Sequence, residues 1–198
     1  MDEGLIFVLS APSGTGKTTV VERVVTTLHP RLTRGISTTS RTPRRGEMDG
    51  VHYYFRTRSQ FIELIAEGKI AEYDEFPPGG EGSFYGTECR VIEEPWLSGK
   101  HPFLALTWPG MVNLSKKYPN QVVSIFMDAE SPEHIERRLR ARGDLPDDKI
   151  RSRLESGAEE RAQAWRFSHL VINREGQLEE TVQEIVRIVR VRLATLER

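Results

Sequence analysis

A candidate phosphate-binding loop lies near the start of the chain. Residues 11–18 read APSGTGKT, which matches the G-x-x-x-x-G-K-[ST] pattern except that Ala11 takes the place of the first glycine. In such a loop the backbone N–H groups and the N-terminus of the next helix converge on a phosphate. Lys17 would neutralise the β- and γ-phosphates and Thr18 would offer a hydroxyl to Mg²⁺. The motif therefore predicts a bound nucleoside triphosphate.

The alternative is a Gly/Ser turn that only connects a strand to a helix. A lysine in the first turn of a helix is disfavoured by the helix dipole, so Lys17 makes better sense beside a phosphate. Gly14 and Gly16 permit the tight backbone. Ala11 fits only if its φ is negative, because its methyl group disfavours the left-handed region.

The second chemical feature is residues 37–55, which read STTSRTPRRGEMDGVHYYF and are dense in hydroxyl and guanidinium groups. This segment closely resembles the acceptor-binding stretch of guanylate kinases, STTTR-x-PR-x-GE-x-DG-x-x-Y-x-F, and the resemblance extends over nearly the whole chain. A solvated Ser/Thr/Arg loop is the alternative. The resemblance implies that the γ-phosphoryl group of ATP, with Mg²⁺, is transferred to GMP or dGMP.

The resemblance implies a role for four side chains at the acceptor phosphate. Arg41 and Arg44 become its clamp, Glu47 holds them and Tyr53 adds a hydroxyl. Forked guanidinium groups suit a phosphate dianion, and a neighbouring carboxylate fixes their orientation.

The same resemblance places the guanine base. Glu72 would accept hydrogen bonds from N1–H and the exocyclic amine, a donor pair that adenine lacks. Ser37 would face the base, Thr87 would lie near O6, and the Tyr85 hydroxyl would contact phosphate. For Glu72 alone a surface glutamate is the ordinary alternative, and its occurrence with Tyr85 and Thr87 in family order favours the functional role.

The ATP side is completed by a basic segment, residues 137–153, which carries seven cations against three acids. It resembles the arginine lid of the family, so Arg138, Arg142 and Arg153 are expected to close on the transferring phosphoryl group. The other arginines are expected to form a solvated helix face. By resemblance Asn173 contacts adenine. The residues assigned to ATP binding are Ala11, Pro12, Ser13, Gly14, Thr15, Gly16, Lys17, Thr18, Thr19 and Asn173.

The chain departs from the family in one strand. Guanylate kinases usually have L-D-I-D-x-Q-G, whereas residues 104–110 read LALTWPG, so Ala105 and Thr107 replace two acids and Pro109 replaces a glutamine. One charge-assisted contact is worth about 1.5–3 kcal/mol, so a slower enzyme or a changed acceptor is an open alternative. The loop at residues 77–82 is also longer than the family's G-N-x-Y link.

The elements that position these residues alternate between strands and helices, which predicts an α/β fold with a mainly parallel sheet flanked by helices. The expected strands are residues 5–9, 52–55, 70–76, 102–106, 122–127 and 170–173. The expected helices are residues 17–29, 59–67, 110–118 and 132–142, a longer one from 147, and a C-terminal helix. We expect Phe61, Ile62 and Ile65 to face inward from their helix, and Trp165 from the helix that begins at 147.

The length and composition of the chain restrict its domain number and its partners. The 198 residues favour one domain, and 28 Lys+Arg against 29 Asp+Glu leave a net charge of −1, which argues against nucleic-acid or membrane partners. The single cysteine, Cys89, allows no internal disulfide. The apolar run 5–9 is too short to span a bilayer. A cytoplasmic enzyme is the expectation, and a monomer or a homodimer fits it.

These observations predict a P-loop kinase with an inserted acceptor lobe and a small helical lid. The core is expected at residues 1–35, 91–136 and 154–198, the lobe that binds the nucleoside monophosphate (NMP) at 36–90 and the lid at 137–153. Two alternatives stay open. One is a kinase of the same fold with another phosphorylated acceptor, as in the related ribose bisphosphate kinases. The other is a binding module like the guanylate-kinase-like domains of scaffold proteins, against which Lys17 and Thr18 argue.

Overall fold

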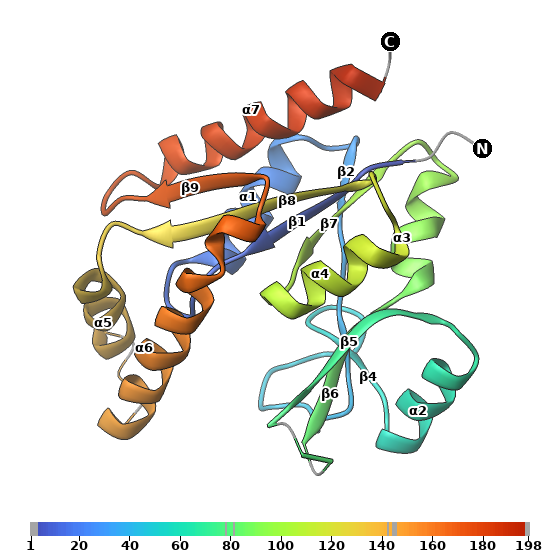
Figure 1. The fold of residues 1–198 in the computed structure, drawn as a ribbon, viewed down its shortest axis with the longest axis horizontal. Helices are drawn as coiled ribbons and strands as arrows, with labels where there is room; N and C mark the ends of the chain where they lie inside the picture. Colours follow the sequence, from blue (N-terminus) through green and yellow to red (C-terminus); the bar gives the residue numbers. More distant parts are fainter. Residues whose placement is uncertain (1–3, 78, 81, 142, 144–145, 197–198) are drawn as a thin grey trace.

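A computed structural model of the protein describes residues 4–77, 79–80, 82–141, 143 and 146–196. Its centre is a sheet of five parallel strands (Figure 1). In spatial order these are β2 (Leu32–Arg34), β7 (His101–Ala105), β1 (Ile6–Ser10), β8 (Val122–Ala129) and β9 (His169–Asn173). The carboxyl ends of these strands meet at one edge of the sheet, where ligands bind in open α/β folds.

Helices cover both faces of this sheet. Alternate residues of β1 enter two different cores, because successive side chains of a strand point to opposite faces. Phe7 and Leu9 pack with α1 (Lys17–Thr27) and α7 (Leu178–Leu196), whereas Ile6 and Val8 pack with α3 (Cys89–Trp96) and α4 (Trp108–Lys117). This two-sided burial explains the continuous apolar run of β1.

A second, smaller sheet lies beyond the carboxyl edge of the first (Figure 1). Its order is β4 (Tyr54–Phe55), β3 (Thr38–Thr39), β6 (Ser83–Glu88) and β5 (Ile70–Phe76). The pairs β3–β6 and β5–β6 are antiparallel, and helix α2 (Arg58–Ala66) packs on this sheet through the buried Phe61. The sheet places Glu72 on β5 beside Tyr85 and Thr87 on β6, and the other predicted acceptor residues lie in the segments that border β3 and β4.

Two helices, α5 (Pro132–Ala141) and α6 (Asp147–Ala162), follow β8 and project from the same edge (Figure 1). A small apolar cluster of Ile135, Leu139 and Ile150 holds them together, with Leu154 packed against it. A short 3₁₀ turn, Ala164–Arg166, then leads into β9.

The predicted α/β fold with a mainly parallel sheet flanked by helices is confirmed. Strands β2, β3 and β6 and helix α3 were not predicted. Strands β2 and β3 have only three and two residues, and β6 includes Gly86. Two expected core positions are wrong. Ile62 is 48% exposed because α2 buries only one narrow stripe, and Trp165 is 73% exposed because the helix ends before it.

Candidate active site

The phosphate loop leaves the carboxyl end of β1 and opens helix α1, as the motif predicts. Gly14 and Gly16 have φ values of 91° and 92°, which other residues adopt only with strain. Two side chains of α5 would lie 3.1–3.2 Å from a Cβ on Gly14, so the loop needs glycine there for space as well. Asn120 is the only residue other than glycine with positive φ in the described chain, so Ala11 has the negative φ that its methyl group requires.

Lys17 lies at the start of α1 and reaches back over the loop. Its Nζ donates to the backbone oxygen of Ala11 at 3.4 Å. Burial lowers the pKa of Lys17, and the nearby carboxylate of Glu160 on α6 opposes that shift. Thr15 braces the loop by donating its hydroxyl to the Pro12 oxygen at 2.7 Å. The cation is thus held close to the backbone groups that would surround a phosphate.

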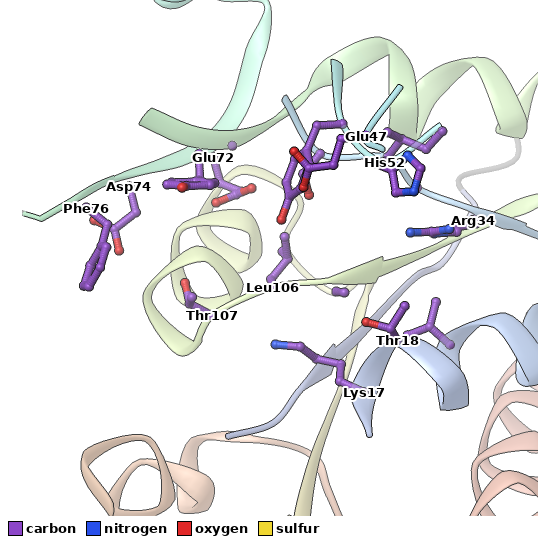
Figure 2. Close-up of a pocket in the computed structure, with 18 residues that line it drawn as sticks. Lys17, Thr18, Arg34, Glu47, His52, Glu72, Asp74, Phe76, Leu106 and Thr107 are labelled. Atoms are coloured by element: carbon purple, nitrogen blue, oxygen red, sulfur yellow. The ribbon is translucent and has the colours of Figure 1, made fainter. Parts of the chain in front are cut away.

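A cavity of about 490 Å³ opens between the loop and the smaller sheet (Figure 2). Lys17 and Thr18 line one side of it, and the strand end at Ala105 and Thr107 adds a wall without a carboxylate. The predicted acceptor residues that line the cavity are Ser37, Glu47, Tyr53, Glu72 and Tyr85. The structure therefore brings the phosphate loop and these five residues to one space, whereas the predicted Arg41, Arg44 and Thr87 are not among the residues that line it.

Arg41 and Glu47 form a bidentate ion pair beside this cavity. The two guanidinium nitrogens donate to the two carboxylate oxygens at 2.6 and 2.7 Å, and the backbone N–H of Arg44 donates to Glu47 at 2.7 Å. The hydrogen bond from Arg41 is the main cause that lowers the pKa of Glu47 to about 2. The Arg41 guanidinium also lies over the Tyr53 ring, 5.0 Å from its centroid, and that ring meets Tyr85 edge-on at 6.2 Å. One guanidinium is thus fixed in orientation.

Glu72 is a buried carboxyl group, only 6% exposed, in the wall of the same cavity. Strands β5 and β6 place it opposite Thr87, which donates its hydroxyl to Oε1 at 2.6 Å. A Cβ on Gly110 would lie 2.7 Å from Oε2, so the helix α4 backbone closes the other side. Burial raises the pKa of Glu72 to about 7, with a smaller contribution from Asp74 and an opposing one from Thr87.

Two of the three arginines expected in the lid approach the phosphate loop. Arg138 of α5 donates to the Thr15 oxygen at 3.2 Å, and Arg153 of α6 donates to the Ser13 hydroxyl at 3.4 Å. Arg142 lies outside the described residues. Arg137 and Arg140 are exposed and pair with surface carboxylates, in line with a solvated face.

Asn173 is the last residue of β9 and lies at the edge of the loop. Its amide nitrogen donates to the Thr15 oxygen at 2.6 Å, and its carbonyl oxygen accepts from the Thr181 hydroxyl at 3.1 Å. A second hollow of about 380 Å³ lies here, lined in part by Gly14, Thr19 and Asn173. Asn173 therefore both supports the phosphate loop and borders a space next to it.

Within the described ranges, no group of three or more His, Cys, Asp or Glu side chains could hold a metal ion. Thr107 instead caps helix α4, accepting from the Gly110 N–H at 3.4 Å. The residues present fit Mg²⁺ as an ion that nucleotide phosphates would carry, to which the exposed Thr18 hydroxyl would offer an oxygen.

The cavity is also lined by residues that the sequence did not single out as site residues, among them Arg34, His52, Asp74 and Phe76. For two of them a signal was present. Asp74 and Phe76 follow Glu72 at intervals of two in an expected strand, so all three share a face.

The fold and the site together define a P-loop kinase. The chain belongs to the guanylate kinase family, whose model matches residues 4–192. The guanylate kinase of Mycoplasmoides gallisepticum is 32% identical over 94% of this chain and 92% of its own. That of Desulfitobacterium hafniense is 34% identical over 88% and 84%.

Solved structures agree with this assignment. The guanylate kinase of Anaplasma phagocytophilum superimposes with a TM-score of 0.72 at 29% identity, covering 97% of this chain and 87% of that one. A gluconokinase of Sinorhizobium meliloti, 16% identical with a TM-score of 0.53 over 99% and 98% of the two chains, shares the fold alone. No helix in the described ranges has both the length and the apolar character that a membrane span needs.

Proposed function

We propose that the protein transfers the γ-phosphoryl group of ATP to GMP or dGMP, giving ADP and the nucleoside diphosphate. One observation carries this conclusion: the buried Glu72, which accepts a hydrogen bond from Thr87, lines the same cavity as Lys17 of the phosphate loop. A buried carboxyl group is costly unless something pairs with it. The N–H donors of a guanine base would supply that partner.

Recognition of the base falls to Glu72, Thr87 and Ser37. The ionised Glu72 accepts from guanine N1–H and the exocyclic amine, whereas adenine presents an acceptor at N1 and meets a carboxylate with repulsion. Ser37 faces the base, and Thr87 lies near O6. Selectivity for guanine follows from this arrangement of donors and acceptors.

The acceptor phosphate is held by Arg41 and Arg44, with the hydroxyls of Tyr53 and Tyr85. Glu47 fixes the Arg41 fork before the substrate arrives, so less orientational freedom is lost on binding. An acceptor held in this way presents a phosphate oxygen in line with the γ-phosphorus.

The transfer itself needs positioning and charge stabilisation. An oxygen of the acceptor phosphate forms a bond to the γ-phosphorus while the bond to the β,γ-bridging oxygen breaks and ADP leaves with that electron pair. Lys17 and the lid residues Arg138, Arg142 and Arg153 stabilise the charge on the transferring group. Mg²⁺ held by Thr18 and the phosphates of ATP would add to that stabilisation. The acceptor is already an anion, so no general base is needed.

The three functional parts of the protein correspond to segments of the sequence. We assign residues 36–90 to the NMP-binding lobe, residues 137–153 to the lid and the remainder to the core. The ATP phosphates take the loop at residues 11–19, and adenine takes the hollow beside Asn173, whose amide borders it.

An assay of ADP release with a panel of monophosphates tests this function. GMP and dGMP should be turned over well above AMP, CMP, UMP and a ribose bisphosphate acceptor, and Lys17→Met should abolish turnover in the same preparation. Turnover of the ribose acceptor in preference to GMP would favour a different kinase of this fold. Calorimetry with ATP and Mg²⁺ distinguishes both kinases from a binding module, which would release no heat of nucleotide binding.

A further inference from the structure

Asp74 lies two residues beyond Glu72 on β5, so the two carboxylates share one face of the strand at a spacing of roughly 7 Å along the strand. Both line the cavity, and Figure 2 shows them entering it from the same strand above Thr107. The two groups also influence one another, since Asp74 contributes to the raised pKa of Glu72. Asp74 is therefore part of the wall that would border the guanine base.

Among the described residues three carboxylates line this cavity, and they differ in the hydrogen bonds that they already accept. Glu47 is committed to Arg41 and to the Arg44 backbone, and Glu72 is engaged by Thr87. Within the described ranges Asp74 accepts one hydrogen bond, from the neighbouring Glu75 N–H to Oδ1 at 2.9 Å. Its Oδ2 atom and most of its lone pairs are available to a ligand.

The facing wall adds no competing charge, because Ala105 and Thr107 are neutral. Two carboxylates on one face repel, and a group that donates to both relieves that repulsion. The exocyclic amine of guanine has two N–H bonds that diverge. One lies parallel to N1–H and is taken with it by Glu72, whereas the other points away from N1 and needs an acceptor farther along the wall.

We propose that Asp74 is a specificity-determining residue that accepts this second N–H of the guanine exocyclic amine. The inference rests on the proposed function and deepens it, since it separates guanine from hypoxanthine, which has N1–H but no amine. Glu72 reads the N1 edge that both bases share, and Asp74 reads the group that only guanine carries.

The test compares Asp74→Ala with wild type on GMP, dGMP and IMP, by kcat/KM and by the calorimetric Kd of each monophosphate. Loss of one charge-assisted hydrogen bond should lower kcat/KM and affinity about 10- to 100-fold for GMP and dGMP. The values for IMP should change less than about twofold, because inosine offers no amine to lose. Asp74→Asn keeps an acceptor oxygen, so its kcat/KM and affinity for GMP should lie between those of wild type and Asp74→Ala.

A matched control is Glu94→Ala, which removes an exposed carboxylate from α3, outside the cavity. An equal loss on IMP and GMP would overturn the proposal and make Asp74 a merely structural residue. A loss on GMP that spares dGMP would overturn it in favour of a ribose contact, and no loss on any acceptor would also reject it. Wild-type protein without GMP turnover would instead contradict the proposed function.

Discussion

The hydroxyl of Thr87 donates to a carboxylate oxygen of Glu72 across 2.6 Å, and both side chains are buried on adjacent antiparallel strands. One hydrogen bond does not replace the water that an ionised carboxylate loses, so burial raises the pKa of Glu72 to about 7. The folded protein therefore holds this group near the midpoint of its titration at neutral pH. A ligand that brings N–H donors is favoured there, because it stabilises the ionised form.

Glu72→Gln should stabilise the protein without ligand at alkaline pH. The pKa of Glu72 rises on folding from its usual 4.5 to about 7, so the folded state binds the proton more tightly than the unfolded state. The free energy of unfolding therefore falls as pH rises through that interval and stays low above it. The neutral glutamine can still accept from Thr87, and the gain at pH 8 should be up to about 3 kcal/mol.

Urea unfolding of both proteins at pH 4 and pH 8 measures this difference. The two curves should nearly coincide at pH 4, where Glu72 is protonated in the folded and the unfolded states. A variant that is less stable than wild type at pH 8 would contradict the shift.

GMP affinity should decrease below about pH 7, by up to tenfold per pH unit, because Glu72 must lose its proton before it can accept from guanine. Calorimetry from pH 5.5 to 8.5 measures the dependence. The phosphate of GMP titrates in the same range, but it does so equally in Glu72→Gln, so the difference in slope between the two proteins isolates the carboxyl group. Identical slopes would mean that Glu72 does not meet the N1–H edge.

Glu47→Gln should weaken acceptor binding and leave ATP binding unchanged. Glutamine can keep only part of the bidentate contact with Arg41, so the guanidinium fork loses its fixed orientation toward phosphate. We expect KM for GMP to rise about tenfold with KM for ATP unaltered. Steady-state kinetics with each substrate varied in turn makes the measurement, with Glu63→Gln on the exposed side of α2 as control. A matching rise in KM for ATP would show general damage.

Much of the fold was predictable because its signals are local. The apolar run at residues 5–9 indicated a strand buried on both faces, and the phosphate motif placed Lys17 at the start of a helix. The smaller sheet was not predictable in the same way. Thr38 and Thr39 form a strand only because they pair with β4 and β6, and two polar residues carry no periodicity.

In the site, too, features that depend on neighbouring residues were predictable, and features that depend on the packing of separate elements were not. The resemblance to guanylate kinases paired Glu47 with Arg41 and Arg44, and the structure contains an ion pair between Glu47 and Arg41, which lie in one short loop. The loss of acids at positions 105 and 107 was visible in the sequence, but the fact that Asp74 lines the same cavity as these two positions was not. That relationship depends on how two separate elements face one another.

The last prediction concerns an acid introduced at position 107, on the wall of the cavity that carries no carboxylate, with and without removal of Asp74. Thr107→Asp should keep helix α4 intact, because aspartate caps an N-terminus at least as well as threonine, and the helix dipole keeps it ionised. In the wild-type background it adds a third negative charge near Glu72, which raises the pKa of Glu72 further and should lower kcat/KM for GMP about tenfold. Combined with Asp74→Ala, the same change should restore activity toward the wild-type value. Thr107→Asn, a neutral cap of the same shape as aspartate, should not restore the activity of Asp74→Ala. If the losses in kcat/KM of Thr107→Asp and Asp74→Ala simply add in the double variant, the two positions do not contact the same group of the ligand.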